Sequence, residues 1–148
     1  MRNIRTLVAV SAAGPDRLQM PSLGCGSLDD AELLASLPAG DSAHVLLEDC
    51  RGADDLQRFD IALSVAEARA GRDVGAIKIV AGTASAASLL HVATLAGRSA
   101  RLVGLAWDRG GFSRDLGCTP DAPLAAHGEM TWLIAARATG LPLYRLAD

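Results

Sequence analysis

Three acidic side chains follow predicted strands of this chain and could act together at one edge of a sheet. Glu48 and Asp49 come directly after the apolar segment 44–47, and Asp108 comes directly after the segment 101–107. Paired carboxylates can hold a cation, or they can serve as a general acid and a general base. Acidic residues at strand ends also cap the following helix or face solvent, and this structural role is the more frequent one.

A cation and two glycines follow the same strand. The segment Asp108-Arg109-Gly110-Gly111 could bind an anionic group through its backbone amides and the Arg109 guanidinium. It does not match the phosphate-loop motif, so an ordinary loop is the alternative. Cys50 follows two acids, which raise the pKa of its thiol and make it a poor nucleophile. The histidines have no metal-ligand spacing and the cysteines form no C-x-x-C pair, so we expect neither zinc nor disulfides.

Apolar runs alternate with helical stretches along most of the chain. We expect strands at 5–11, 44–47, 76–82, 101–107 and 142–146, and helices at 29–37, 53–70, 87–97 and 124–139. Residues 17–26 contain Pro21, Gly24 and Gly26 and are expected to be irregular. Alternation of this kind is typical of a parallel sheet covered by helices.

Right-handed crossovers would place the carboxyl ends of all the strands on one rim, where ligands bind in such folds. The rim would comprise Ser11-Ala12, Glu48-Asp49, Ala81-Gly82, 107–109 and Arg145. Five parallel strands cannot close into a tight barrel, so the sheet should have two open edges. Open edges favour pairing with another chain, so we expect a homo-oligomer.

The composition excludes several classes of partner. Half of the residues are hydrophobic and 3% are aromatic, so the core must consist mainly of Ala, Val, Leu and Ile. The net charge of −3 provides no basic surface for nucleic acid. No apolar run approaches the roughly 20 residues of a membrane span, and the opening MRNIRTLVAV is too short for a signal peptide. We expect a cytoplasmic protein that binds neither nucleic acid nor membranes.

Five motifs, in order, resemble the family of citrate lyase beta subunits and HpcH/HpaI-type aldolases. RTLVAV at 5–10 is similar to the first strand of that family, and VLLEDCRGADDL at 45–56 is similar to its fifth strand and helix. VAGTA at 80–84 resembles the strand that ends in Ile-Glu-Thr. Residues 102–117 resemble the next strand and helix, and LIAARATGLP at 133–142 resembles the final helix. The resemblance implies one α/β domain over residues 1–148, with parallel βα units related to a TIM barrel but truncated to about five strands.

The departures from the family motifs fall on its magnesium ligands. Gly82 and Gly111 stand where the family has acidic ligands, and Asp49 stands where it has a lysine. About 30 residues replace the three βα units after the first strand, which include the segment that supplies the family's substrate-binding arginine. The resemblance therefore carries over no catalytic or metal-binding residue.

Three hypotheses about function follow from the resemblance. The first is a protein without the family's magnesium-dependent C–C lyase activity and without a cofactor, which acts as an oligomeric scaffold or binds an acyl-thioester or carboxylate. Its candidate ligand-binding residues are Arg5, Glu48, Asp49, Asp108 and Arg109. The second is an active lyase or aldolase on CoA-thioester or 2-oxo-acid substrates, with Mg²⁺ held by Glu48, Asp49 and Asp108. The third is a barrel fragment that a partner subunit completes.

Overall fold

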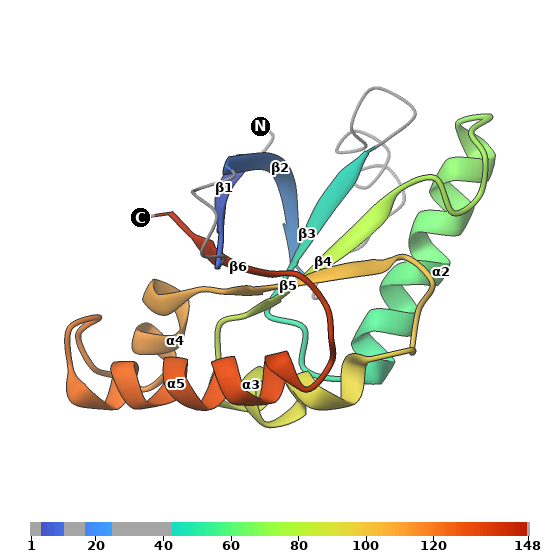
Figure 1. The fold of residues 1–148 in the computed structure, drawn as a ribbon. Coiled ribbons are helices and arrows are strands. Elements are labelled where there is room, and N and C mark those ends of the chain that lie inside the picture. Colours follow the sequence, from blue (N-terminus) through green and yellow to red (C-terminus); the bar gives the residue numbers. More distant parts are fainter. Residues whose placement is uncertain (1–3, 11–16, 25–42, 148) are drawn as a thin grey trace.

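Six strands form a closed barrel in a computed structural model that describes residues 4–10, 17–24 and 43–147 (Figure 1). The strands follow one another around the barrel in chain order: β1 (Ile4–Ala9), β2 (Arg17–Gly24), β3 (His44–Glu48), β4 (Lys78–Thr83), β5 (Leu102–Trp107) and β6 (Leu143–Leu146). Neighbouring strands from β2 to β6 run parallel, as expected of βα units.

Helices cover one side of this barrel. They are α2 (Ala53–Arg69), α3 (Ala86–His91), a 3-10 turn η1 (Val92–Leu95), α4 (Arg109–Asp115) and α5 (Pro123–Arg137). In Figure 1, α3, α4 and α5 lie below the strands, and α2 stands beside them. Within the described ranges, no helix is long and apolar enough to cross a membrane. The predicted strands at 44–47, 76–82, 101–107 and 142–146 and the helices at 53–70 and 124–139 are confirmed within a few residues.

One local prediction is confirmed in part, one is wrong, and one cannot be compared. The predicted helix at 87–97 is confirmed as α3 in its first half and continues as the 3-10 turn η1. The predicted loop at 108–111 is the start of α4, because the Asp108 side chain accepts a hydrogen bond from Gly111 N and caps this helix. The predicted helix at 29–37 lies outside the described residues.

β2 occupies a segment that was expected to be irregular. Its Pro21 pairs with Ile4, the first residue of β1, and the parallel ladder to β3 begins only at Ser22. The missing N–H of Pro21 therefore falls where one ladder ends and the other has not begun, so the strand tolerates it. β2 adds the sixth strand that the five-strand prediction lacks.

β1 runs antiparallel to both of its neighbours, β2 and β6. The connection from Ala9 to Arg17 is too short for the crossover that parallel strands require, whereas antiparallel strands need only a short turn. The amino end of β1, with Arg5, therefore lies at the rim formed by the carboxyl ends of the other strands. The prediction that the carboxyl end of β1 would lie at this rim is wrong.

The barrel closes through β1, so the prediction of an open sheet with two free edges is also wrong. A (β/α)8 barrel has eight parallel strands, and these six strands include one antiparallel member. Since the edges are paired with each other, the argument from open edges to an oligomer no longer applies. The oligomer itself stays a prediction.

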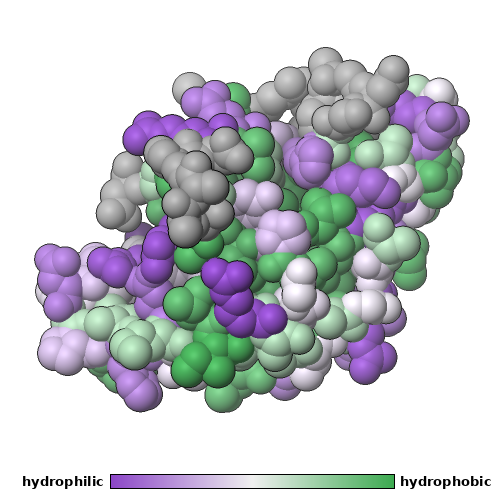
Figure 2. Space-filling view, viewed as in Figure 1, coloured by the Kyte–Doolittle hydropathy of each residue, from purple (hydrophilic) through white to green (hydrophobic). Residues whose placement is uncertain are grey.

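The core consists of two apolar layers, because successive side chains on a strand point to opposite faces of the sheet. The layer inside the barrel contains Leu7, Met20, Leu46, Val80 and Ala106, all at most 3% exposed. The larger layer lies between the barrel and the helices. There the ring of Trp107 packs against Phe112 at 4.7 Å and against Trp132 at 5.7 Å, measured between ring centroids. Figure 2 shows apolar surface across the middle of the viewed face, with hydrophilic residues both within it and around it.

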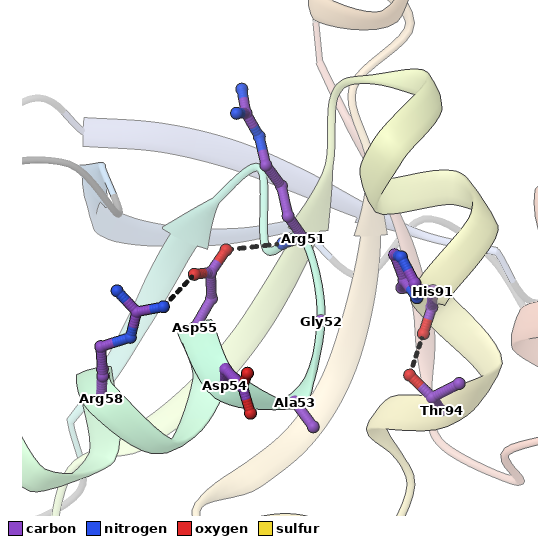
Figure 3. Close-up of a pocket in the computed structure, with 8 residues that line it drawn as sticks. All are labelled: Arg51, Gly52, Ala53, Asp54, Asp55, Arg58, His91 and Thr94. Carbon is purple, nitrogen blue, oxygen red and sulfur yellow. Dashed lines mark hydrogen bonds and ion pairs between the residues drawn. The ribbon is translucent and has the colours of Figure 1, made fainter.

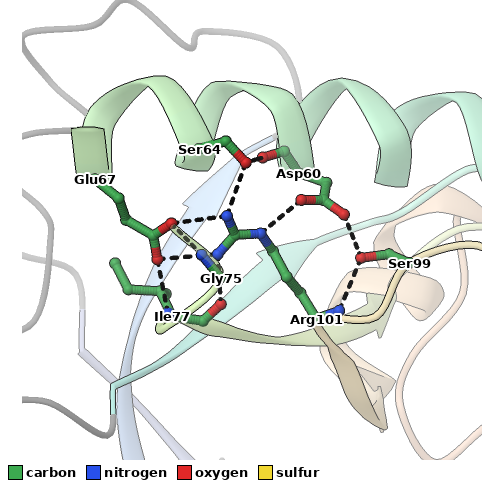
Figure 4. A network of polar contacts seen from close by, with 7 residues as sticks. All are labelled: Asp60, Ser64, Glu67, Gly75, Ile77, Ser99 and Arg101. Carbon is green, nitrogen blue, oxygen red and sulfur yellow. Dashed lines mark hydrogen bonds and ion pairs between the residues drawn. The ribbon is translucent and has the colours of Figure 1, made fainter. Parts of the chain in front are cut away.

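A buried ion cluster ties α2 to the amino ends of β4 and β5 (Figure 4). The Arg101 guanidinium donates to both carboxylate oxygens of Glu67, at 2.9 and 2.7 Å, and also to Asp60. Glu67 is fully buried and accepts two further hydrogen bonds from Gly75 N and Ile77 N. This cluster lies at the opposite end of the barrel from the rim and fixes the loop that leads into β4.

Candidate functional site

Three of the predicted site residues meet at the carboxyl rim, inside the barrel. Arg5, Glu48 and Asp108 each stand two positions from a member of the inner apolar layer, so their side chains point the same way. Arg5 Nη2 lies 3.2 Å from Asp108 Oδ2, and Arg5 Nε lies 3.9 Å from Glu48 Oε1. We call these three residues the rim cluster. The rim cluster carries a net charge of −1 and lies next to the apolar layer inside the barrel.

The rim cluster is held in place by the strand ends and by α4. Asp108 accepts a hydrogen bond from Gly111 N at 2.8 Å with its other carboxylate oxygen, and its own N–H donates to Thr83 O. Arg5 Nε is buried and has no hydrogen-bond partner among the described residues. A ligand that approaches this guanidinium must therefore compete with two acidic side chains that are already close to it.

Asp49 does not join the rim cluster, contrary to the hypothesis of three converging acids. Its backbone adopts the left-handed conformation, with φ 49°, and its carboxylate accepts from Ser85 Oγ at 2.7 Å and from Ala84 N. The other oxygen pairs with Arg51. Burial opposes ionisation, but hydrogen bonds from Ser85, Ser88 and Arg51 hold the pKa of Asp49 below its usual range. Asp49 thus stabilises the start of α3.

The two glycines at the family's acidic positions stand where a Cβ atom would be crowded. A Cβ atom at Gly82 would lie 3.0 Å from Leu47 O, in the backbone of β3. A Cβ atom at Gly111 would lie 2.8 Å from both Ala84 Cβ and Asp108 Oδ2. A side chain at either position would therefore require its neighbours to move.

The described residues do not fit the magnesium that the family resemblance implies. Mg²⁺ is held by oxygen ligands in near-octahedral geometry, usually with one or two carboxylates. The two acids at the rim already face the Arg5 guanidinium, which repels a cation. Among the described residues, no three or more His, Cys, Asp or Glu side chains are grouped so that they could hold a metal ion.

Arg109 belongs to a second cluster, on the outer side of the barrel. Its guanidinium donates to Glu129 Oε2 through Nη2 at 2.5 Å and through Nε at 3.2 Å, and Arg145 Nε donates to Glu129 Oε1 at 2.5 Å. Burial raises the pKa of Glu129, but the hydrogen bonds from both arginines outweigh it and lower that pKa. We call Arg109, Glu129 and Arg145 the arginine pair cluster. It joins α4, α5 and β6 beside Trp107.

Sequence reasoning placed Arg145 at the rim but missed Glu129. Arg109 was expected to act from a glycine loop, whereas it is the first residue of α4. The signal that could have found Glu129 is that it is the only acidic residue in the largely apolar helix α5 and is flanked by apolar residues at 132–136. A single acid on such a helix, 7% exposed, requires a cationic partner.

A further cavity, of about 460 Å³, lies between the loop after β3, the start of α2 and the end of α3 (Figure 3). Asp55 accepts from Arg51 N at 3.0 Å and pairs with Arg58 at 3.6 Å. The other polar contact drawn there, from Thr94 to the carbonyl oxygen of His91, lies within one turn of chain. The Asp54 carboxylate and the His91 imidazole make no hydrogen bond or ion pair with the other lining residues in Figure 3.

These observations define an α/β barrel of mostly parallel strands, with charged side chains at the carboxyl rim and helices on its outer face. Solved structures with this fold include RipC from Yersinia pestis, which aligns with 82% of this chain and 54% of its own, at a TM-score of 0.63 and 18% identity. A citrate lyase beta subunit from Mycobacterium tuberculosis, complexed with oxaloacetate and magnesium, covers 82% of this chain and 51% of its own, with a TM-score of 0.58 and 22% identity.

A third similar structure is the protein CitE from Mycobacterium tuberculosis in complex with magnesium, acetoacetate and coenzyme A. It covers 82% of this chain and 43% of its own, with a TM-score of 0.55 and 21% identity. This chain therefore spans about half the length of the structures it matches. No protein-family model matches the chain, and no curated protein is similar to it in sequence. The resemblance to the citrate lyase beta subunit is confirmed at the level of the fold.

Proposed function

We propose that this protein is a citrate lyase beta-like protein that lacks magnesium-dependent C–C lyase activity and binds an acyl-thioester or carboxylate ligand. The similar CitE structure contains acetoacetate, which is a carboxylate, and coenzyme A, the thiol from which acyl-thioesters are formed. An oligomeric scaffold is the related form of this proposal, and it requires self-association in solution.

The observation that carries the proposal is the packing around Gly82 and Gly111. A Cβ atom at Gly82 would be tight against the β3 backbone, and a Cβ atom at Gly111 would require Ala84 or Asp108 to shift. The acids that remain at the rim face a cation instead of an open coordination site. The absence of acidic side chains at positions 82 and 111 and the pairing of the rim acids with Arg5 both support the loss of a magnesium-dependent activity.

The alternative is an active lyase or aldolase with a relocated magnesium site. Glu48 and Asp108 favour it, because both carboxylates lie within 4 Å of one guanidinium and thus near each other. Asp49, the third acid of that hypothesis, is hydrogen-bonded at the start of α3 instead. An active relocated site would have to expel Arg5 and bind magnesium with two carboxylates.

Two assays on the same preparation test the proposal. We expect no heat of Mg²⁺ binding in calorimetry and no cleavage of citramalyl- or malyl-thioesters. Cleavage that requires Mg²⁺ and disappears in both Glu48→Gln and Asp108→Asn would overturn the proposal and establish the alternative. Arg17→Gln, on the exposed start of β2, serves as the control variant. Sedimentation at micromolar concentration tests the scaffold form, which a monomer contradicts.

A further inference from the structure

Two adjoining cavities open beside the arginine pair cluster. One has a volume of about 310 Å³ and is lined by Trp107, Leu146 and the three charged side chains. The other has a volume of about 210 Å³, shares Arg109, Glu129 and Arg145, and adds apolar side chains of α5. We propose that this place on the outer side of the barrel binds a small organic carboxylate with a short apolar tail.

The charge of the cluster favours an anion. Two guanidinium groups share one carboxylate, which leaves a net charge of +1, and the arginine side chains are 44% and 48% exposed. Arg145 donates only through Nε, and its two Nη groups have no hydrogen-bond partner among the described residues. A planar carboxylate is the anion that matches the fork of such a guanidinium. The rim cluster, with a net charge of −1, repels the same ligand.

The second cavity supplies an apolar wall next to these cations. Ala126, Met130 and Leu133 line it, and their spacing of four and three residues places them on one face of α5. Met130 is 67% exposed, so an apolar tail that lay against it would remove hydrocarbon from water on both sides. Each methylene group that becomes buried should strengthen binding about fourfold. The combination of cation and apolar wall selects an amphipathic carboxylate over inorganic anions.

The inference deepens the ligand-binding form of the proposed function, but it does not depend on the absence of lyase activity. The lyase and magnesium assays report on the rim, whereas carboxylate binding reports on the outer side of the barrel. Cleavage activity together with hexanoate binding would overturn the proposed function alone. Lack of binding together with lack of cleavage would overturn this inference alone.

Titration calorimetry with acetate, butyrate, hexanoate and hexanamide is the test. We expect affinity to rise with tail length, hexanoate to bind at least about tenfold more tightly than the uncharged hexanamide, and inorganic phosphate to bind more weakly than hexanoate. A short peptide with a free carboxyl-terminal leucine distinguishes a small ligand from a partner's chain end. Tighter binding of that peptide than of hexanoate would overturn the assignment to a small molecule.

Three variants place the binding at this cluster. Arg145→Gln should weaken hexanoate binding at least about tenfold, and Arg145→Lys should weaken it less. Glu129→Gln should tighten binding, because the carboxylate that competes for both arginines is removed. An ion cluster with a structural role alone predicts no such gain. Arg17→Gln, with a cation on the exposed start of β2, should bind like the wild type.

Thermal denaturation of each variant shows whether it is folded at the titration temperature. If Arg145→Gln unfolds, Arg145→Lys and Glu129→Gln carry the test. Unchanged hexanoate affinity in Arg145→Lys and Glu129→Gln, or no hexanoate binding to the wild type in the millimolar range, overturns the inference.

Discussion

Replacement of Arg101 by methionine should destabilise the protein strongly, although the residue lies far from the rim. The Arg101 side chain is 4% exposed and donates to both oxygens of Glu67, whose side chain is fully buried. Without the guanidinium, the Glu67 carboxylate keeps only two backbone donors, Gly75 N and Ile77 N. The variant therefore contains an uncompensated buried charge.

The expected loss is about 3–5 kcal/mol, which is the usual cost of removing one partner of a buried ion pair. That is a large part of the roughly 5–15 kcal/mol that stabilises a domain. In the double variant Arg101→Met/Glu67→Gln the fully buried charge of Glu67 is removed as well, and the glutamine oxygen can still accept from a backbone N–H. The double variant should therefore be more stable than Arg101→Met alone, by about 1–3 kcal/mol.

Urea denaturation near neutral pH, followed by circular dichroism, measures these free energies of unfolding. Arg17→Met is the matched control, because the replaced arginine is exposed, and it should change stability by less than about 0.5 kcal/mol. A loss below about 1 kcal/mol in Arg101→Met would refute the reasoning. A double variant that is less stable than Arg101→Met would refute it as well.

Three further predictions follow from the rim and its surroundings. Gly82→Ala should destabilise the protein by about 1–3 kcal/mol, because the new Cβ atom would lie 3.0 Å from the β3 backbone. Gly24→Ala, where no atom lies within 4 Å of the new Cβ, should change stability little, and the midpoints of urea denaturation compare the two variants. The pKa of Asp49 is lowered in the folded state, so its ionised form stabilises the fold. This contribution to the free energy of unfolding is present above the unfolded pKa of about 4 and is lost as the pH falls through the lower folded value. Asp49→Asn should therefore reduce the loss of stability between neutral pH and about pH 3, and an unchanged loss would contradict this role. Burial, more than the neighbouring acids, raises the pKa of Cys50 to about 11. Iodoacetamide at about pH 8 should therefore modify the half-buried Cys118 and leave Cys50 unmodified until urea is added. Mass spectrometry of peptides measures the modification of each cysteine.

Much of the fold could be predicted because its signals are local. The helix at 53–69 follows from an apolar stripe with Asp54 and Asp55 in its first turn, and β4 and β5 follow from continuous apolar runs. The direction of β1 could not be predicted, because it depends on pairing with β2. The Pro21 in β2 made that segment look irregular in the sequence. Because β2 was not predicted, closure of the barrel could not be predicted either.

The candidate site was predicted in part. Arg5, Glu48 and Asp108 are brought together, but Asp49 and Arg109 belong to other contacts. The direction of the Asp49 side chain could not be read from the chain, because its backbone turns into the left-handed region at that residue. A turn of this kind changes which face a side chain reaches, and the periodicity of the strand before it contains no sign of it.

The sequence by itself determined where acidic residues, basic residues and glycines stand at the strand ends, including the glycines at 82 and 111. These are properties of residue type, and folding cannot alter them. Only the tertiary structure decided which charges meet: Arg5 reaches Asp108 because β1 is antiparallel, and Arg145 reaches Glu129 because β6 pairs with β5, against which α5 packs. The physical reason is that Coulomb attraction and hydrogen bonding depend on distance in space, which the closure of the barrel sets.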